Sequence, residues 1–499
     1  MLQNLFGKRI IKDMEQTVLT NDEIEAEVAE RERKQFEKMT KTPVSRLVVS
    51  LGIPTMLNMM VTSLYNLADT FFVSGLGKQA TGALNVVLPL MSVIQAIGFT
   101  FGMGAGALVS RLLGERKQKE ADKVASSSFF ISGVIGMIIL LFGLIFLSPL
   151  MWLLGATEET GVAVSTLEYS RQYSRWILLS APFMCMSFVM NNLLRAQGKA
   201  VLSMIGLVTG TVVNVVLDPL LIYSANLGMT GAALATMIGQ LVSFAILLYM
   251  FLSGKTIAQL KVSAISKKFY VYKNVLITGF PSFCRQILAS LCTVLLNWSV
   301  KPFGEGLAAL GVVQKVFMFA FSISLGIGQG YQPVLGYNYS AKRFDRVRSA
   351  YVFTLCFSTV LMVLFASACA IFAPNIMKTF LTDELREQEI GELALTLQCI
   401  CMPLLPVNFM AGVTYQVVGN KAVASLLSIS RQGLFYIPAV LILPKTIGMF
   451  GVQSCQALSD LLSFVFAIPF TILFFKDLRK AQNAYEKELQ EKEALEQNE

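Results

Sequence analysis

Six ionisable residues interrupt the apolar stretches of this 499-residue chain, and they offer the clearest chemistry in its sequence. They are Asp69, Asp218, Arg285, Lys315, Arg431 and Asp460. A charge near the middle of a bilayer costs roughly 2.5–3.5 kcal/mol on the insertion scale, so each marks a functional site or a pair that holds helices together. The bases can also reach toward water or bind backbone carbonyls. The first half of the chain holds two of the acids and none of these bases.

The two acids of the first half predict a site for a cation or a proton. Asn214 precedes Asp218 by four residues and shares its helix face. Tyr65 stands in the same relation to Asp69. Counted from the expected helix ends at about 1.5 Å per residue, Asp69, Asp218 and Thr236 lie at similar depth. Carboxylates, an amide and hydroxyls at one depth bind Na⁺ or hold H⁺. We expect this coupling ion, and no other cofactor or metal, at Asp69, Asn214, Asp218 and Thr236, with Tyr65 in support.

The other charged residues leave alternatives open. Asp460 lies about twelve residues into its expected helix, where it either contacts substrate or pairs with Arg431. Arg285, Lys315 and Arg431 belong either to a substrate path or to inter-helix pairs. The two acids of the first half could also pair separately with bases of the second half.

The elements that position these residues are long apolar helices. The chain is 54% hydrophobic with a mean hydropathy of +0.61, which excludes an ordinary soluble globule. Each apolar run is long enough to cross a hydrocarbon core of about 30 Å as a helix, and none alternates with the period of a strand. The twelve expected spans are 46–74, 82–110, 126–154, 167–194, 200–224, 229–253, 274–300, 307–336, 350–374, 390–418, 423–444 and 448–476.

An internal repeat relates residues 52–253 to 279–476. KAVLS at 199–203 recurs as KAVAS at 421–425, and GMTG at 228–231 recurs as GMFG at 448–451. A Gly-x-Pro opens each half, so that Pro54 and Pro281 lie in the first helix of their halves and permit a bend there. The predicted fold class is an all-α membrane protein with twelve transmembrane helices in two six-helix lobes, related by a parallel repeat. The expected divisions are a charged extension 1–43, an N-lobe 44–253, a linker 254–273, a C-lobe 274–476 and a charged tail 477–499.

Basic residues in the loops predict the orientation of the chain. With both termini inside, the inner loops hold 17 Lys and Arg and the outer loops hold seven. We therefore expect a multi-pass protein of the cell membrane with cytoplasmic termini, no cleaved signal peptide, and a monomeric state. The net charge of +9 follows from this topology, because the basic residues form no stripe for nucleic acid.

Several functional classes are excluded or disfavoured by composition. The chain has no histidine, which excludes His-based catalysis, His-ligated metal and histidine proton relays. No GxxxxGK[ST] motif is present, so ATP hydrolysis is not expected. The eight cysteines all fall in expected spans, where they read as packing residues. We expect no enzyme. The 23 Met and 35 Phe suit a cavity for varied apolar molecules, or plain core and lipid-facing positions.

Three long segments resemble the multidrug and toxic compound extrusion (MATE) family, and within it the MepA-like bacterial subgroup. The segments are YNLADTFFVSGLG (65–77), NVVLDPLLIY (214–223) with GMTGAALAT (228–236), and GQGYQPVLGYNYSAKRFDRVR (328–348). The resemblance covers residues 39–478. It implies a V-shaped pair of six-helix lobes that exports organic cations in exchange for Na⁺ or H⁺.

The resemblance also implies roles for individual residues. The family's cation site consists of an Asp in the first helix, an Asn and an Asp four apart in the fifth, and a Thr in the sixth. These positions match Asp69, Asn214, Asp218 and Thr236. Some subgroups also have a functional Glu in the seventh helix. Here that stretch reads SFCRQILAS (282–290), with Arg285 and no acid, so a second cation site of that type is not expected.

The expected function is multidrug efflux by secondary antiport, in which organic, mostly cationic and amphiphilic compounds leave in exchange for H⁺ or Na⁺. The alternative is a flippase for lipid-linked substrates on a related fold. A flippase would require a basic central cavity, and Arg285, Lys315 and Arg431 keep that alternative open. A channel would need no duplicated lobes, and an enzyme would need a nucleophile and base that are hard to find without histidine.

Overall fold

The computed structural model describes residues 21–158, 164–254, 256–381 and 385–496. These described residues form helices and connecting loops and contain no strand. Twelve of their helices are long and apolar enough to cross a membrane. The predicted all-α class with twelve transmembrane helices is therefore confirmed.

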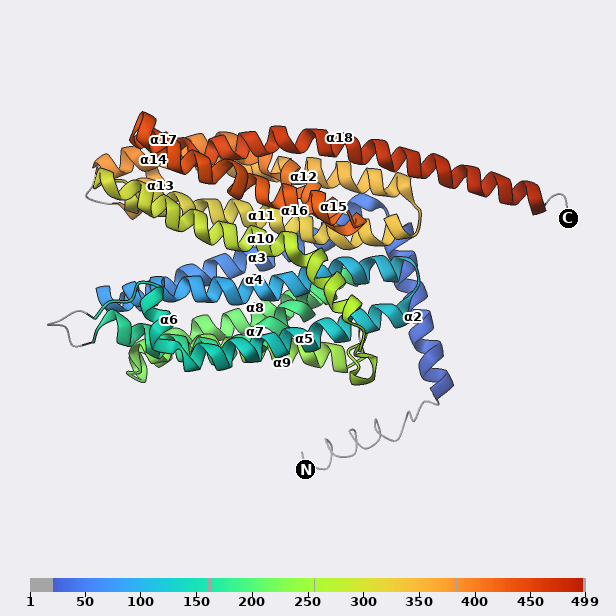
Figure 1. The fold of residues 1–499 in the computed structure, drawn as a ribbon, viewed down its shortest axis with the longest axis horizontal. Coiled ribbons are helices and arrows are strands. Elements are labelled where there is room, and N and C mark those ends of the chain that lie inside the picture. The colour runs from blue at the N-terminus through green and yellow to red at the C-terminus, as the bar shows by residue number, and fades with distance from the viewer. Residues whose placement is uncertain (1–20, 159–163, 255, 382–384, 497–499) are drawn as a thin grey trace, which may run out of the picture.

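The helices form two lobes that lie side by side, with α3 and α4 of the N-lobe facing α10 and α11 of the C-lobe (Figure 1). The N-lobe helices are α3 (Val44–Ser74), α4 (Lys78–Gly114), α5 (Gln118–Ile145), α6 (Leu147–Leu153), α7 (Thr166–Ala196), α8 (Ala200–Pro219) and α9 (Gly228–Leu252). The C-lobe helices are α10 (Phe269–Val300), α11 (Leu307–Ser340), α12 (Phe344–Ile371), α13 (Ala373–Phe380), α14 (Leu385–Cys401), α15 (Leu405–Val418), α16 (Lys421–Ile429), α17 (Ile437–Ile447) and α18 (Met449–Glu496).

The two lobes repeat the same order of elements. The repeated KAVLS and KAVAS motifs begin α8 and α16, and the GMTG and GMFG motifs begin α9 and α18. A short helix, α6 or α13, follows the third helix of each lobe. The fifth helix of each lobe also contains a π-helical segment, Leu220–Ser224 in one lobe and Ser430–Tyr436 in the other. This order is what a parallel internal repeat predicts.

Three boundaries differ clearly from the expected ones. The tenth span is divided at Met402–Leu404, because Pro403 and Pro406 lack the N–H groups that a continuous helix needs. Helix α10 begins at Phe269, within the residues expected as linker, and α18 continues through the charged tail to Glu496. In Figure 1 the last turns of α18 extend beyond the helical bundle.

The lobes approach most closely at one end of the bundle. We call this end the linker side, because α2, the 256–268 connection and the end of α18 lie there, at the right of Figure 1. A Cβ atom on Gly330 of α11 would overlap the backbone of Gly52 in α3, and one on Gly279 of α10 would overlap the backbone of Thr100 in α4. Glycine allows the helix backbones to pack this tightly.

The inter-lobe face of α11 is open toward the opposite end, the far side. Ser322 is buried and its hydroxyl lies 2.9 Å from that of Ser63 on α3. Met318 and Lys315 precede Ser322 by one and two helical turns on the same face, and both are exposed. The lobes therefore close on the linker side and separate toward the far side.

Helix α2 (Asn21–Lys41) bridges the two lobes across the linker side (Figure 1). The Gln35 side chain donates a hydrogen bond to the Gln197 carbonyl of the N-lobe at 2.8 Å. The Asn338 side chain of the C-lobe donates to the Met39 carbonyl at 3.1 Å. The charged extension is thus docked against both lobes over part of its length.

Candidate functional site

The two carboxylates of the N-lobe are buried in neighbouring helices. Asp69 lies near the far-side end of α3 and is 5% exposed, and Asp218 lies near the far-side end of α8 and is fully buried. Helices α3 and α8 pack against each other, and the two carboxylates lie within electrostatic range. The structure therefore brings together the two acids that the sequence analysis placed at similar depth in the membrane.

These carboxylates have few hydrogen-bond donors. The Tyr173 hydroxyl of α7 donates to one Asp69 oxygen at 3.4 Å. The other Asp69 oxygen and both Asp218 oxygens accept no hydrogen bond from the described residues. Burying a bare carboxylate costs several kcal/mol unless a proton or a cation neutralises it. The arrangement can therefore bind H⁺ or a small cation.

The amide and hydroxyl groups lie around the acids. The Asn214 side chain donates to the Thr236 hydroxyl at 3.3 Å, and its own carbonyl oxygen accepts no hydrogen bond from the described residues. The Tyr65 hydroxyl is within electrostatic range of both carboxylates and close to Thr236. Side-chain oxygens that could bind a cation thus come from four helices, α3, α7, α8 and α9, and lie at one depth.

No base of the described chain neutralises the pair. Neither Asp69 nor Asp218 forms an ion pair with a described residue. Arg195, a buried base of the N-lobe, lies at the linker-side end of α7 and donates to the side chains of Asn191 and Asn192. In this structure the acids do not pair with bases of the second half.

A hollow inside the N-lobe lies beside the carboxylates. Its wall includes Tyr65, Asn214 and Thr236 of the candidate site. The rest of the wall combines apolar and neutral polar side chains, namely Thr62, Asn66, Met91, Gln95, Met184, Ser187, Phe188, Leu207, Thr211, Gln240 and Ser243. The candidate cation site and the hollow therefore share these three residues.

The charged residues of the C-lobe have different surroundings. Arg431 forms an ion pair with Asp460, with 2.7 Å between Nε and Oδ1, and the Gln456 amide donates to the same oxygen at 3.0 Å. The structure thus shows the salt bridge, one of the two alternatives for Asp460. Arg285 lies over the Phe409 ring at 5.2 Å from its centre, and Lys315 is exposed on the inter-lobe face of α11.

The two prolines lie inside continuous helices. Pro54 is in α3 and Pro281 is in α10, and each helix extends on both sides of its proline. Both lie near the tight glycine contacts on the linker side. A role in bending remains a proposal.

Tyr173 is the site residue that the sequence argument missed. It lies seven residues after Thr166, where α7 begins at the far side. This depth resembles that of Thr236, eight residues after the start of α9. The depth argument would have found Tyr173 had it been applied to the fourth span as well.

The fold and the site define a class of protein, a multi-pass membrane transporter built from two repeated helical lobes. A model of the MatE family matches residues 54–220 and 281–442, which together make up more than half of the chain. The chain belongs to the MatE family.

Curated relatives and solved structures agree with this assignment. The multidrug export protein MepA of Staphylococcus aureus (strain NCTC 8325 / PS 47) is 26% identical over 424 residues, which is 84% of this chain and 91% of MepA. A crystal structure of MATE in complex with MaL6 superimposes with a TM-score of 0.84 at 25% identity, covering 90% of this chain and 99% of that one. An outward-facing multidrug resistance MATE transporter of the MOP superfamily gives a TM-score of 0.83 at 25% identity, with 89% and 98% covered. The relatives are transporters and not enzymes.

Proposed function

We propose that this protein exports organic, mostly cationic and amphiphilic compounds by antiport with H⁺ or Na⁺, bound by Asp69, Asn214, Asp218 and Thr236. The observation that carries this proposal is the buried carboxylate pair without a base. A site that needs a cation, placed beside a hollow for small molecules, couples the two ligands. Multidrug export is also the activity named for MepA, and the outward-facing structure is that of a multidrug resistance transporter.

The proposed cycle uses the two lobes as rigid bodies. With the termini in the cytoplasm, the linker side is the inner side, and the structure corresponds to a state open to the outside. Substrate enters from the inside when the lobes part there, and rocking of the lobes then exposes it outside. Cation entry at Asp69 and Asp218 displaces the substrate. One monovalent ion moving down 100 mV releases about 2.3 kcal/mol, enough for roughly a fiftyfold gradient of a neutral drug.

Transport in proteoliposomes tests the proposal. The parent is expected to extrude ethidium when a Na⁺ or H⁺ gradient is imposed, and Asp69→Asn and Asp218→Asn are expected to lose this gradient-driven transport. Asp345→Asn is the matched control, because that acid is exposed at the start of α12, far from the site. Replacing Na⁺ with choline at fixed pH identifies the ion. Gradient-driven transport at parental rates by both site variants would refute the proposal.

A flippase for lipid-linked substrates is the second candidate. The observation that favours it is the cluster of bases in the C-lobe, with Lys315 exposed on the inter-lobe face and Arg285 without an ion pair among the described residues. Its distinguishing result is translocation of a fluorescent lipid pyrophosphate between leaflets without any ion gradient. Gradient-dependent ethidium efflux without lipid translocation favours the antiporter.

A further inference from the structure

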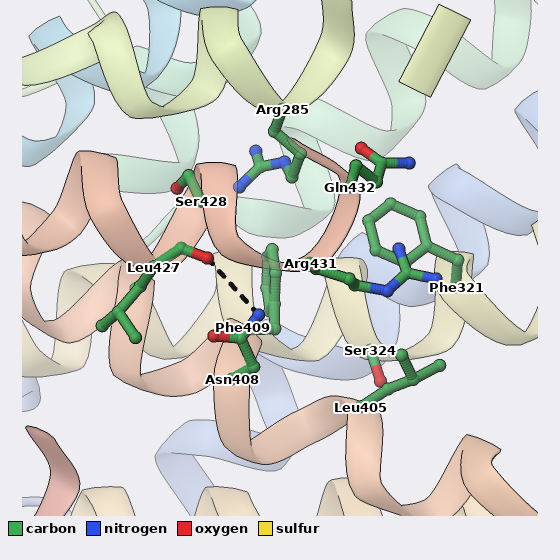
Figure 2. A pocket seen from close by; sticks show the side chains of 11 residues that line it. Arg285, Phe321, Ser324, Leu405, Asn408, Phe409, Leu427, Ser428, Arg431 and Gln432 are labelled. Atoms are coloured by element: carbon green, nitrogen blue, oxygen red, sulfur yellow. Dashed lines mark hydrogen bonds between the residues drawn. The ribbon is translucent and has the colours of Figure 1, made fainter. Parts of the chain in front are cut away.

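A second pocket lies inside the C-lobe, away from the carboxylate pair. Figure 2 shows the Arg285 side chain reaching from its helix toward Phe409, with Arg431 and Phe321 beside each other in the same pocket. The hollow has about 480 Å³ of empty space, including the part open to the surroundings.

The pocket carries more positive than negative charge. Arg285 forms no ion pair and no hydrogen bond with the described residues, and its guanidinium lies over the ring of Phe409. Arg431 is 8% exposed and uses Nε to pair with Asp460, but its buried Nη2 has no hydrogen-bond partner among the described residues. The pocket thus holds two guanidinium groups, and the one carboxylate nearby, that of Asp460, pairs with Arg431.

A structural role accounts for only part of this arrangement. The ion pair with Asp460 explains why Arg431 is retained, and stacking over Phe317 at 4.8 Å gives its guanidinium further stabilisation. Neither contact satisfies Nη2, and neither concerns Arg285. An uncompensated guanidinium in a membrane-embedded lobe is costly, so a ligand that supplies the missing negative charge would be bound favourably.

The rest of the lining indicates what such a ligand must carry. The rings of Phe321 and Phe409 lie edge to face at 6.2 Å, and they present apolar surface beside the guanidinium groups. The side-chain oxygens of Asn408 and Gln432 are buried without hydrogen-bond partners among the described residues, so a donor on the ligand would satisfy them. Guanidinium groups bind carboxylates in a planar, bidentate geometry.

We propose that this C-lobe pocket is a binding site for amphiphilic organic anions, in which Arg285 and the free Nη2 of Arg431 hold a carboxylate and the two phenylalanines hold its aromatic body. Zwitterions with an additional donor fit the same lining. The site extends the substrate range beyond the cations of the proposed function, and it does not depend on the N-lobe carboxylates.

Calorimetry on the full chain in phosphatidylcholine nanodiscs tests the site with 2-naphthoate, and with the neutral 2-naphthylmethanol as its matched probe. The parent is expected to bind naphthoate at least tenfold more tightly than the alcohol. Arg285→Gln is expected to remove most of that preference, and Arg285→Lys to restore part of it. Lys315→Gln is the control, because it removes one positive charge outside the pocket and is expected to leave the preference unchanged.

A second variant, in which naphthoate affinity is expected to rise, keeps the test decisive if Arg285→Gln folds poorly. Asp460→Asn removes the carboxylate that competes for Arg431, so naphthoate is expected to bind severalfold more tightly and to raise the melting temperature more than in the parent. Asp69→Asn and Asp218→Asn are expected to bind naphthoate like the parent, which separates this site from ion coupling. Equal affinity for the acid and the alcohol, or unchanged naphthoate binding in both Arg285→Gln and Asp460→Asn, would overturn the proposal.

Discussion

Asp69 and Asp460 are both buried carboxylates in membrane-spanning helices, but their partners differ. Asp460 forms an ion pair with Arg431 and accepts a hydrogen bond from the Gln456 amide. Asp69 has one hydroxyl donor, Tyr173 at 3.4 Å. A paired acid has its charge compensated by the protein, whereas a bare acid has to obtain a proton or a cation from outside. This difference supports our proposal that Asp69 binds the coupling ion, whereas Asp460 is already compensated within the C-lobe.

The ion pair of the C-lobe gives a prediction about stability. Arg431→Met leaves Asp460 buried without its base and is expected to reduce the free energy of unfolding by about 3–5 kcal/mol. The double variant Arg431→Met with Asp460→Leu is expected to recover much of that loss, because no uncompensated charge remains. Thermal unfolding of the purified protein measures both. If Arg431→Met unfolds at the parental temperature, the pair does not stabilise the C-lobe.

At the scale of elements, the close contact of α3 and α11 predicts different effects of alanine at two glycines. A Cβ on Gly330 would overlap the Gly52 backbone, whereas a Cβ on Gly52 would lie 3.6 Å from its nearest neighbour, the Ile327 Cα. Gly330→Ala is therefore expected to destabilise the closed linker side by about 1–3 kcal/mol through overpacking. Gly52→Ala is expected to be neutral or slightly stabilising, since alanine favours a helix by about 1 kcal/mol.

Cysteine accessibility on the linker side, together with thermal unfolding, checks this pair of variants. Gly330→Ala is expected to increase labelling of a cysteine introduced at Ser340, at the end of α11, and Gly52→Ala is not. Equal labelling and equal stability in the two variants would show that the lobes do not depend on this close contact.

The docking of α2 is expected to depend on pH through Glu32. Burial raises the pKa of the Glu32 carboxyl above its ordinary value of 4.5, and the Asp122 carboxylate adds to the shift. The docked helix therefore favours protonated Glu32. This contribution is complete below about pH 4.5 and is lost as pH rises through the raised pKa. Docking should weaken with increasing pH.

Hydrogen exchange of the α2 amides, corrected for the intrinsic effect of pH, measures this dependence. Glu32→Gln is expected to abolish the pH dependence and to keep α2 protected at neutral pH. Glu30→Gln is the control, because Glu30 is exposed and pairs with Lys34 at 2.6 Å. A pH dependence that persists in Glu32→Gln would assign it to another group.

Most of the fold could be predicted from the sequence, because helix length and the repeated motifs are local properties of the chain. The docking of α2 could not, since its contacts use backbone carbonyls such as that of Met39, which leave no sequence pattern. The π-helical segments were missed for a similar reason: a shift of the backbone hydrogen bonds does not change the apolar pattern.

The grouping of Asp69, Asp218 and Thr236 followed from depth, whereas the contact between Arg285 and Phe409 required the packing of α10 against α15.

At the scale of the whole molecule, the two lobes keep one scaffold but differ in charge. By the spacing of the repeat, Val440 falls near the position of Asp218 and Asn297 near that of Asp69. The N-lobe thus holds two bare carboxylates, and the C-lobe holds guanidinium groups. This asymmetry is the reason why we propose ion coupling in the N-lobe alone, with the shared scaffold allowing the two lobes to rock against each other.

The most direct test of the account is competition between ion and substrate at equilibrium. Ethidium affinity is measured by fluorescence anisotropy for the full chain in nanodiscs, as Na⁺ is added at fixed pH and as pH is lowered without Na⁺. The parent is expected to bind ethidium more weakly as the coupling ion increases, and Asp218→Asn is expected to bind it with an affinity that no longer responds to that ion. An ion dependence in Asp69→Asn and Asp218→Asn equal to that of the parent would contradict the account.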